Sequence, residues 1–318
     1  MKTNDLERPI AALMAPDKGI LEADESQATI AERFERFAIE PTEESRRRYR
    51  EMLFTMPDVA EYVSGVILID ETLGQRADDG RRFVNVLVER GITPGIKGDL
   101  GAKPLAGAPG ERATEGLAGL RERLKEYRTL GATGGNWRAV IAIGVGQPSG
   151  YCLDTNAHAL ARYAAPCQEA GLVPLVEPEV LMDGAHSIEH AFEGTEAALV
   201  RAFAALRNQR VLLEHILLKP NMVLAGADSP MQANASEVAE ATVRRLRRSV
   251  PVTVPGIVVL SGGQDAKAET DHLNAMNATP TSLPWPLGFS FARALQEPAA
   301  SPQSNGMSEA FENTLRRD

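Results

Sequence analysis

The sequence is poor in features that would each indicate a particular class of protein. Only two cysteines, Cys152 and Cys167, occur in 318 residues, which argues against a disulfide scaffold and for a reducing compartment. No apolar run approaches the roughly 20 residues that cross a bilayer, and residues 1–5 lack the apolar region of a signal peptide. We therefore expect a cytoplasmic protein without a membrane span.

Positive charge is also in deficit. The chain has 34 lysines and arginines against 43 acidic residues, which gives a net charge of −9. This balance argues against bulk nucleic-acid binding and against a polybasic surface for membranes. Hydrophobic residues make up 43% of the chain, enough for one large core. We expect neither nucleic acid nor a membrane among the partners.

Apolar strand candidates alternate with helical segments along the chain. The strand candidates are 19–24, 62–70, 92–99, 137–144, 172–179, 216–219, 256–263 and 283–291. The helical segments are 6–15, 27–38, 42–54, 80–90, 114–130, 154–170, 188–208, 236–249 and one that begins near 292, and a Gly- and Pro-rich loop covers 101–113. Such alternation predicts parallel strands with crossover helices, and eight units predict a single-domain (β/α)₈ TIM barrel.

The alternative α/β architecture, an open doubly wound sheet, would place a Gly-rich fingerprint after the first strand. This chain has Asp24-Glu25-Ser26 there. We therefore assign 1–296 to the barrel. Residues 297–318 are rich in Pro, Ser, Asn and charge and are expected to form a short C-terminal tail.

One lysine stands out by its position in the sequence. Lys219 follows the apolar run 216–218 and precedes Pro220, so a buried strand would deliver one amine to its carboxyl end. A desolvated lysine with cationic neighbours has a lowered pKa and can attack carbonyl carbons. The alternative is a lysine whose head reaches water at a strand end.

Other ionisable or polar residues follow the predicted strands, where TIM barrels carry their chemistry. They are Asp24, Glu71, Lys97, Glu177, Glu179 and Ser261. An amine nucleophile needs a general acid to expel water from its adduct. Glu177 and Glu179 flank Pro178 and point to one side of an extended chain, so either could serve. The alternative is that one of them pairs with Lys97 or Lys219.

The last two units indicate a phosphate site. Ser261-Gly262-Gly263 follows a predicted buried strand, and glycines allow backbone N–H groups to approach a ligand. Arg293 falls in the first turn of the last predicted helix, where an anion is favoured. Phosphate sites of TIM barrels often lie after strands seven and eight. The alternative is an ordinary glycine turn and a surface arginine.

Several longer motifs carry a family resemblance. They are KGILEADES (18–26), GVILIDETL (65–73), ADDGR (77–81), GIKGD (95–99), NWR (136–138), LVPLVEPEVL (172–181), LLKPNMV (217–223), LSGGQ (260–264) and FSFARALQ (289–296). In this order, over residues 10–296, the chain resembles class I fructose-bisphosphate aldolase. The resemblance implies a lyase of glycolysis that cleaves fructose 1,6-bisphosphate, and homotetramers are common in this family.

The resemblance implies a role for each matching residue. Lys219 would form a Schiff base with the ketone carbon of dihydroxyacetone phosphate or of the ketose. Glu177 would be the acid and base of the carbinolamine steps, Asp24 would handle the hydroxyl proton beside the cleaved bond, and Glu179 would hold the charge network. The positions that match the ketone-side phosphate site are Ser261, Gly262 and Arg293; those around the aldehyde-side phosphate are Ser26, Thr29, Arg33 and Lys97; Arg138 matches a further site arginine.

The resemblance implies no metal and no other cofactor. Metal-dependent aldolases need clustered histidines. The five histidines of this chain, His158, His186, His190, His215 and His272, do not form a convincing ligand set.

Three departures from the family pattern bear on the reaction. Asn136 stands where the family has a catalytic lysine before Trp-Arg, and an amide carries no charge and takes no proton. Glu32 stands where the family has a lysine near the aldehyde-side phosphate, a change of two charge units. The chain stops at Asp318 without the family's C-terminal tyrosine.

These departures leave three functions open. The first is an ordinary fructose-bisphosphate aldolase, and the second is a specialised or transaldolase-like enzyme with a different aldehyde acceptor. The third is a catalytically weak paralogue with a binding role.

Overall fold

A closed barrel of parallel strands forms the centre of the molecule. The computed structural model describes residues 4–35, 38–279 and 282–292. Around the barrel the strands follow the order β1-β10-β9-β8-β7-β6-β3-β2. Their bounds are β1 Gly19–Ala23, β2 Val63–Leu68, β3 Thr93–Lys97, β6 Gly134–Ile141, β7 Val173–Val180, β8 Leu217–Leu218, β9 Ile257–Leu260 and β10 Leu287–Phe291. The predicted TIM barrel is confirmed.

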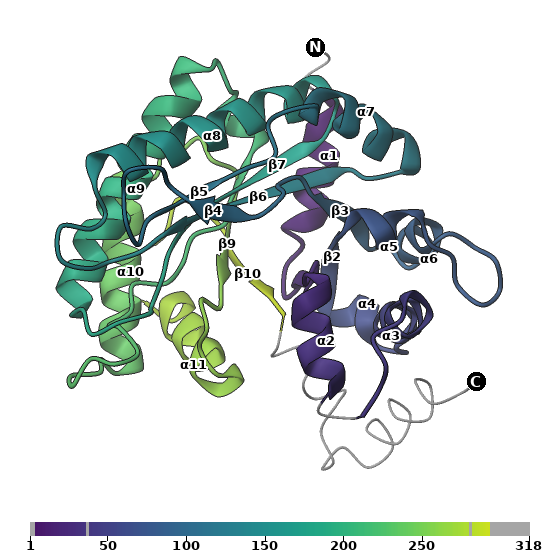
Figure 1. The fold of residues 1–318 in the computed structure, drawn as a ribbon, viewed down its shortest axis with the longest axis horizontal. Helices are drawn as coiled ribbons and strands as arrows, with labels where there is room; N and C mark the ends of the chain where they lie inside the picture. Colours follow the sequence, from purple (N-terminus) through teal and green to yellow (C-terminus); the bar gives the residue numbers. More distant parts are fainter. Residues whose placement is uncertain (1–3, 36–37, 280–281, 293–318) are drawn as a thin grey trace.

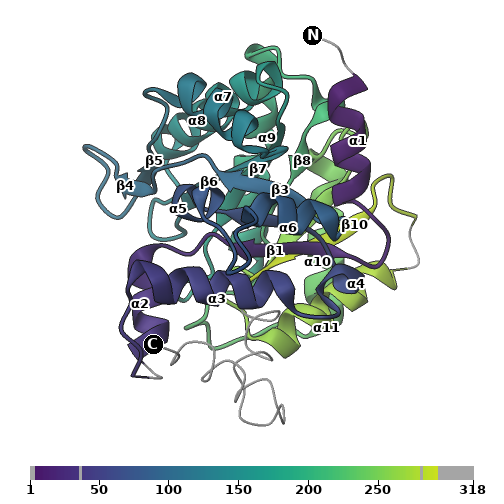
Figure 2. The same cartoon turned by 90° about the vertical axis from the view of Figure 1, so that its right-hand side faces the viewer.

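Helices surround the barrel (Figures 1 and 2). They are α1 Asn4–Leu13, α2 Gln27–Glu35, α3 Glu43–Thr55, α4 Val59–Tyr62, α5 Asp70–Gly74, α6 Phe83–Glu89, α7 Leu120–Leu130, α8 Gly150–Glu169, α9 Ile188–Asn208, the 3-10 helix η1 Leu213–His215, α10 Ala235–Ser249 and α11 Ala266–Asn277. In Figure 1, α8, α9 and α10 lie on one side of the strands and α3, α5 and α6 on the other. No helix within the described ranges is long and apolar enough to cross a membrane.

Polar caps fix where the long helices begin. Ser149 and Ser187 accept hydrogen bonds from the first turns of α8 and α9. At α10, Asn234 and Glu237 form a reciprocal capping box. The helices that follow β6, β7 and β8 therefore start at defined residues, which fixes the loops at the carboxyl ends of those strands.

The first helix closes the amino end of the barrel. Leu6, Ile10 and Leu13 of α1 pack in one buried cluster with strand residues; those are Ile20, Ile67, Val173, Leu175, Leu217 and Val258. Because side chains alternate along a strand, Ile20 shares its face of β1 with Glu22 and Asp24. This end of the barrel is thus apolar, and its charged groups are displaced toward the carboxyl end.

The strand that precedes Lys219, β8, is only two residues long, Leu217–Leu218. Side chains supply hydrogen bonds where its ladder ends: Asn221 Oδ1 accepts from the amide of Val180 at 2.9 Å. The Thr242 hydroxyl of α10 accepts from the amide of Val223, also at 2.9 Å. Lys219 itself donates its backbone N–H to Val176 at 2.8 Å. The segment is therefore held in register although Pro220 has no N–H to donate.

Several predicted elements were wrong or incomplete. The predicted loop 101–113 contains an antiparallel hairpin, β4 Ala102–Pro104 with β5 Arg112–Thr114. The helix predicted over 114–130 begins at Leu120, because Gly116 and Gly119 adopt positive φ. β6 starts at Gly134, before the predicted 137. The close approach of Tyr163 and Cys167 favours glycine at 135, and glycine does not usually indicate a strand. Helices α4, α5 and α11 were not predicted.

Candidate active site

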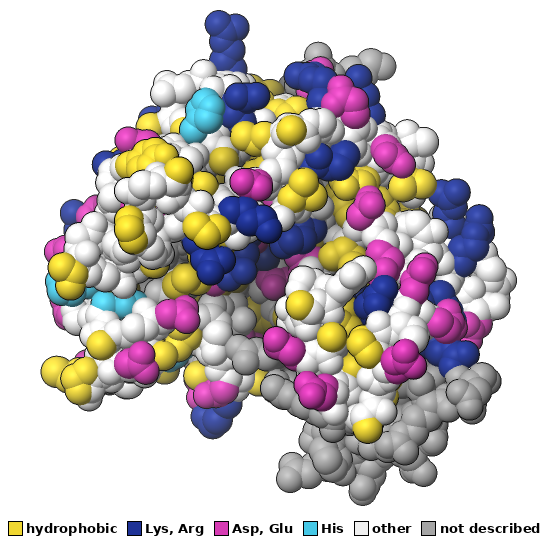
Figure 3. All heavy atoms as spheres, viewed as in Figure 1, with side chains coloured by type: hydrophobic (Ala, Val, Ile, Leu, Met, Phe, Trp, Pro, Cys, Tyr) yellow, Lys and Arg dark blue, Asp and Glu magenta, His cyan; other side chains and the backbone are white. Residues whose placement is uncertain are grey.

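Most of the predicted site residues line one cavity at the carboxyl ends of the strands. Its volume is about 370 Å³, and it is lined by Glu22, Asp24, Glu25, Ser26, Thr29, Lys97, Gly101, Arg138, Glu177, Glu179, Lys219, Leu260, Ser261, Gly262 and Gly263. In the space-filling view, basic and acidic side chains gather around a hollow near the middle of one face (Figure 3). Asn136 lies buried beside the cavity, and Arg33 is not among its lining residues.

Lys219 lies between two carboxylates and is 1% exposed. Its Nζ is 2.7 Å from Oε1 of Glu22 and 3.1 Å from Oε2 of Glu177. Burial alone would lower the pKa of Lys219, but Glu177, Glu22 and Asp24 outweigh it and raise the pKa well above its ordinary value. The unliganded amine is therefore held as an ammonium, and attack on a carbonyl requires a group that removes a proton.

Glu177 connects the lysine to Asn136. The amide Nδ2 of Asn136 donates to Oε2 of Glu177 at 2.7 Å, so this oxygen contacts both the amide and the ammonium. Glu177 Oε1 lies 4.0 Å from Nε of Arg138. The alternative of a glutamate that pairs with Lys219 therefore applies to Glu177, which also lines the cavity.

Glu179 and Arg138 form a second pair at the cavity wall. Nε of Arg138 donates to Oε2 of Glu179. Burial raises the pKa of Glu179, and the contact with Arg138 opposes that rise. Arg138 is 43% exposed on its side chain, so it can also present its guanidinium to an anion in the cavity.

Lys97 is the other lysine of the cavity. Its Nζ lies 3.7 Å from Asp24 and 3.5 Å from Asp99. Burial would lower the pKa of Lys97, and the two aspartates more than compensate and raise it. Asp24 therefore acts on both lysines, because its carboxylate also contributes to the raised pKa of Lys219.

Glu22 is a site residue that the sequence reasoning missed. The predicted site residues lie at strand ends, whereas Glu22 lies inside β1. The available signal was the period of the strand: Ile20, Glu22 and Asp24 alternate with the buried Leu21 and Ala23. A glutamate two residues before a candidate site aspartate should have been placed on the same face of the strand.

The aldehyde-side residues are only partly gathered. Ser26 and Thr29 line the cavity, and their hydroxyl oxygens are 3.0 Å apart. Arg33 instead pairs with Glu25 at 2.9 Å, and Glu25 also holds the buried Arg50 at 2.6 Å.

Two more acids stand apart from the cavity. Glu32 is exposed on α2. Glu71, also at a predicted strand end, pairs with Arg46 at 2.7 Å and does not line the cavity.

The glycine turn after β9 reaches the cavity as predicted. Ser261, Gly262 and Gly263 all line it. Gly262 and Gly263 have φ of +63° and +97°, a conformation that strongly favours glycine. The second part of the predicted phosphate site, Arg293, and the tail 297–318 lie outside the described residues.

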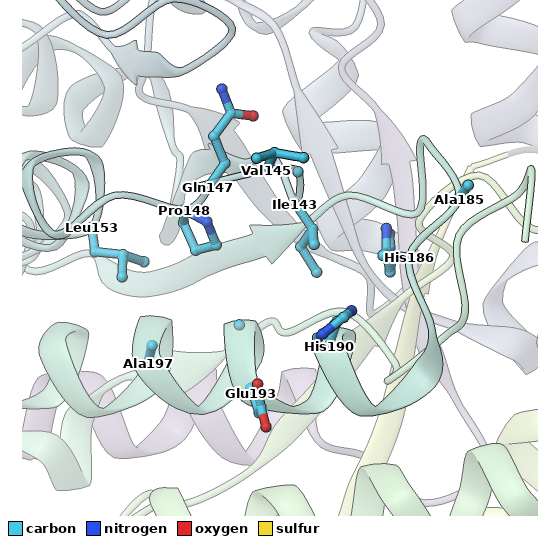
Figure 4. A pocket seen from close by; sticks show the side chains of 12 residues that line it. Ile143, Val145, Gln147, Pro148, Leu153, Ala185, His186, His190, Glu193 and Ala197 are labelled. Atoms are coloured by element: carbon cyan, nitrogen blue, oxygen red, sulfur yellow. The ribbon is translucent and has the colours of Figure 1, made fainter.

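A more voluminous cavity, about 550 Å³, lies elsewhere (Figure 4). It is formed between the loop after β6, which carries Ile143 and Val145, and the first turns of α9, which carry His190 and Glu193. It is mostly apolar and contains neither a lysine nor a pair of carboxylates. The chemistry of amine and acid therefore belongs to the smaller cavity. Within residues 4–35, 38–279 and 282–292, no three His, Cys, Asp or Glu side chains could jointly hold a metal ion.

Comparisons with known proteins agree with this geometry. The family model described as "Fructose-bisphosphate aldolase class-I" matches residues 5–315. A probable fructose-bisphosphate aldolase class 1 from Xanthomonas campestris pv. campestris is 54% identical over 307 residues, covering 96% of this chain and 92% of its own length. The cytosolic fructose-bisphosphate aldolase 4 of Arabidopsis thaliana is 48% identical over 297 residues, which cover 93% of this chain and 76% of that protein.

The fold comparison points the same way. A crystal structure of fructose-bisphosphate aldolase from Plasmodium falciparum superposes with a TM-score of 0.93 at 41% sequence identity, covering 98% of this chain and 91% of the other. Family model, relatives and fold agree over nearly the whole length, and the chain belongs to the class I fructose-bisphosphate aldolase family.

Proposed function

We propose that the protein catalyses the reversible aldol cleavage of fructose 1,6-bisphosphate through a Schiff base on Lys219. The observation that carries this proposal is the buried Nζ of Lys219, which lies 3.1 Å from Glu177 at the wall of a polar cavity. Amine catalysis needs a nucleophile and an acid–base group within hydrogen-bond reach of each other. Membership of the class I aldolase family supports the same reaction.

The side chains around Lys219 suit the successive steps. Glu177 moves protons to and from the carbinolamine formed at the ketone carbon. Asp24, which faces Lys97 at 3.7 Å, takes the proton from the hydroxyl beside the bond that breaks. Glu179 keeps Arg138 oriented toward the cavity through their ion pair.

The two ends of the cavity suit the two phosphates of the substrate. The turn at Ser261 and Gly262 would receive the ketone-side phosphate, together with Arg293. The aldehyde-side phosphate would meet a second group of residues: Ser26, Thr29, Arg33 and Lys97. To contact this phosphate, the guanidinium of Arg33 would have to leave or share its contact with Glu25. No cofactor is needed, since each step uses only proton transfers and the lysine amine.

Two further properties are proposed, the first of them from the family resemblance. We expect a homotetramer and a cytoplasmic location, and the relative from Arabidopsis thaliana is named as cytosolic. Substrates would be sugar phosphates alone.

The test is to trap the Schiff base. Borohydride reduction in the presence of dihydroxyacetone phosphate should add mass to the peptide that contains Lys219. Lys97→Ala is a matched control, because it removes the other lysine of the same cavity and should leave labelling at 219 intact. Labelling that persists unchanged in Lys219→Ala would contradict the proposal.

A second candidate is favoured by two positions of this chain. Asn136 supplies no proton, and Glu32 adds negative charge to the helix beside the aldehyde end. Both would disfavour the reaction with glyceraldehyde 3-phosphate and favour transfer of the three-carbon unit to another aldehyde. Comparing turnover of fructose 1,6-bisphosphate with that of other ketose phosphates separates the two candidates.

A further inference from the structure

Glu22 contacts the amine more closely than any residue used in the steps above. Its Oε1 lies 2.7 Å from Nζ of Lys219, whereas Glu177 lies at 3.1 Å. Glu22 also lines the cavity, and its side chain is 21% exposed, so it faces both the lysine and an incoming substrate. The steps proposed so far give this carboxyl no role.

The surroundings of Glu22 allow it to exchange a proton near neutrality. Lys219, Glu177, Asp24 and Arg138 are among the charged groups that act on it, and Ser290 of β10 donates its hydroxyl to Oε1 at 3.0 Å. Burial raises the pKa of Glu22 to about 7, with Lys219 opposing the rise and Glu177 and Asp24 adding to it. A general base is most effective when its pKa lies near the working pH.

Glu177 contacts Asn136 more closely than it contacts Lys219. Its Oε2, the oxygen that faces Lys219, already accepts the amide of Asn136 at 2.7 Å. At Glu22 the order is reversed, because Lys219 Nζ lies 2.7 Å from Oε1 and the Ser290 hydroxyl lies 3.0 Å from it. Glu177 is also the group that must reach the substrate oxygen, so the two proton transfers are better divided between two carboxylates.

We propose that Glu22 is a catalytic residue that removes a proton from the Lys219 ammonium before the amine attacks the substrate ketone. This inference rests on the proposed Schiff-base function and adds a residue to it.

The ammonium gives one proton to Glu22, and the free amine forms a C–N bond while the carbonyl π electrons move to oxygen. The nitrogen of this adduct gives its second proton to Glu177, which passes it to the oxyanion and leaves a neutral carbinolamine. Glu22 then returns its proton to the departing oxygen, the C–O bond breaks, and the nitrogen lone pair forms the iminium. Both nitrogen protons leave in one water molecule, and both carboxylates are restored.

The decisive variant is Glu22→Gln, which keeps the shape of the side chain and removes the base. The measurement is the rate at which wild type and variant form the borohydride-trapped adduct with dihydroxyacetone phosphate, over a pH series on both sides of neutrality. General-base catalysis contributes about 10²–10⁴-fold, so the variant should form the adduct slower by a factor in that range. Its rate should also lose the rise with pH through about 7 that wild type shows, because that rise reports loss of the Glu22 proton.

A merely structural ion pair predicts the opposite result. Removing an anion beside Lys219 lowers the pKa of the amine, so more free amine exists at neutral pH and the adduct would form faster. A rate that is unchanged or higher in Glu22→Gln therefore overturns the inference. Glu22→Asp, which keeps a carboxyl on a shorter stem, should recover part of the rate and the dependence on pH.

Ser290→Ala provides an independent readout if the glutamine variant does not fold. Losing the hydroxyl that donates to Glu22 destabilises its carboxylate, so the rise in rate should move upward by roughly half to one pH unit. An unmoved profile would count against Glu22 as the titrating group. Failure of the underlying function is recognised separately, since wild type would then trap no adduct at Lys219.

Discussion

Replacing Asn136 by lysine should lower the pH at which the protein becomes active. The Asn136 amide and the Lys219 ammonium contact the same oxygen, Oε2 of Glu177, at 2.7 Å and 3.1 Å. A second ammonium that reached this oxygen would thus lie within about 6 Å of Lys219. At an effective dielectric constant of about 20, two like charges at that distance repel by about 3 kcal/mol, which corresponds to about two pH units.

The sign of the change follows from the present state of the lysine. Carboxylates now raise the pKa of Lys219, so the free amine becomes available only as pH rises. A neighbouring cation lowers that pKa and also favours the carboxylate form of Glu22, so the rise in activity shifts toward lower pH. The assay is cleavage of fructose 1,6-bisphosphate, together with the trapped adduct at Lys219, for wild type and Asn136→Lys over a pH series. Cleavage should also increase, because a lysine can relay a proton where an amide cannot.

A matched control separates charge from size. Asn136→Met introduces a side chain of similar length without a charge into the same buried position. It should leave the pH profile in place, even if it lowers activity by disturbing Glu177. If Asn136→Lys changes neither the profile nor the rate, another residue supplies the lysine's role and the interpretation of this departure is wrong.

Three further variants test other parts of the structure. Glu32→Lys should improve the use of fructose 1,6-bisphosphate by replacing a negative charge near the aldehyde-side residues, and a wild type that already cleaves it as efficiently as its relatives would contradict this. Arg293→Ala should weaken binding of dihydroxyacetone phosphate about tenfold or more by calorimetry, since a charge-assisted contact contributes about 1.5–3 kcal/mol; an unchanged dissociation constant would refute it. Arg50→Met should lower the free energy of unfolding in a denaturant titration by about 3 kcal/mol, because Arg50 is 1% exposed and pairs with Glu25 at 2.6 Å. A loss below about 1 kcal/mol would mean that Arg33 alone compensates Glu25.

The sequence predicted the barrel and most of the cavity because both depend on local pattern. Apolar runs marked the strands, and residues at their carboxyl ends converge in any TIM barrel. Glu22 was missed because its effect depends on β8, a strand that does not pair with β1 but brings Lys219 Nζ within 2.7 Å of its carboxylate. The family resemblance implied that Arg33 binds a phosphate, but its guanidinium pairs with Glu25, which Arg50 of α3 also contacts.

Boundaries failed where glycine changes the usual meaning of a pattern. Glycine is generally unfavourable in strands and so hid the start of β6, where Gly135 lies against Tyr163. Glycines at 116 and 119 likewise ended what looked like a continuous helix. Such positions are decided by contacts with distant residues, which a local pattern does not contain.

The side-chain hydrogen bonds that hold the short strand β8 should also limit which substitutions the protein tolerates outside the cavity. Asn221 accepts a hydrogen bond from the amide of Val180, and Thr242 accepts one from the amide of Val223, although neither side chain lines the cavity. Exchange of Thr242 for valine would preserve volume on α10 but leave the buried amide of Val223 without its acceptor. Purifying selection on the reaction should therefore extend to Asn221 and Thr242. A lineage that loses either hydrogen bond should carry a compensating substitution close to the lost contact.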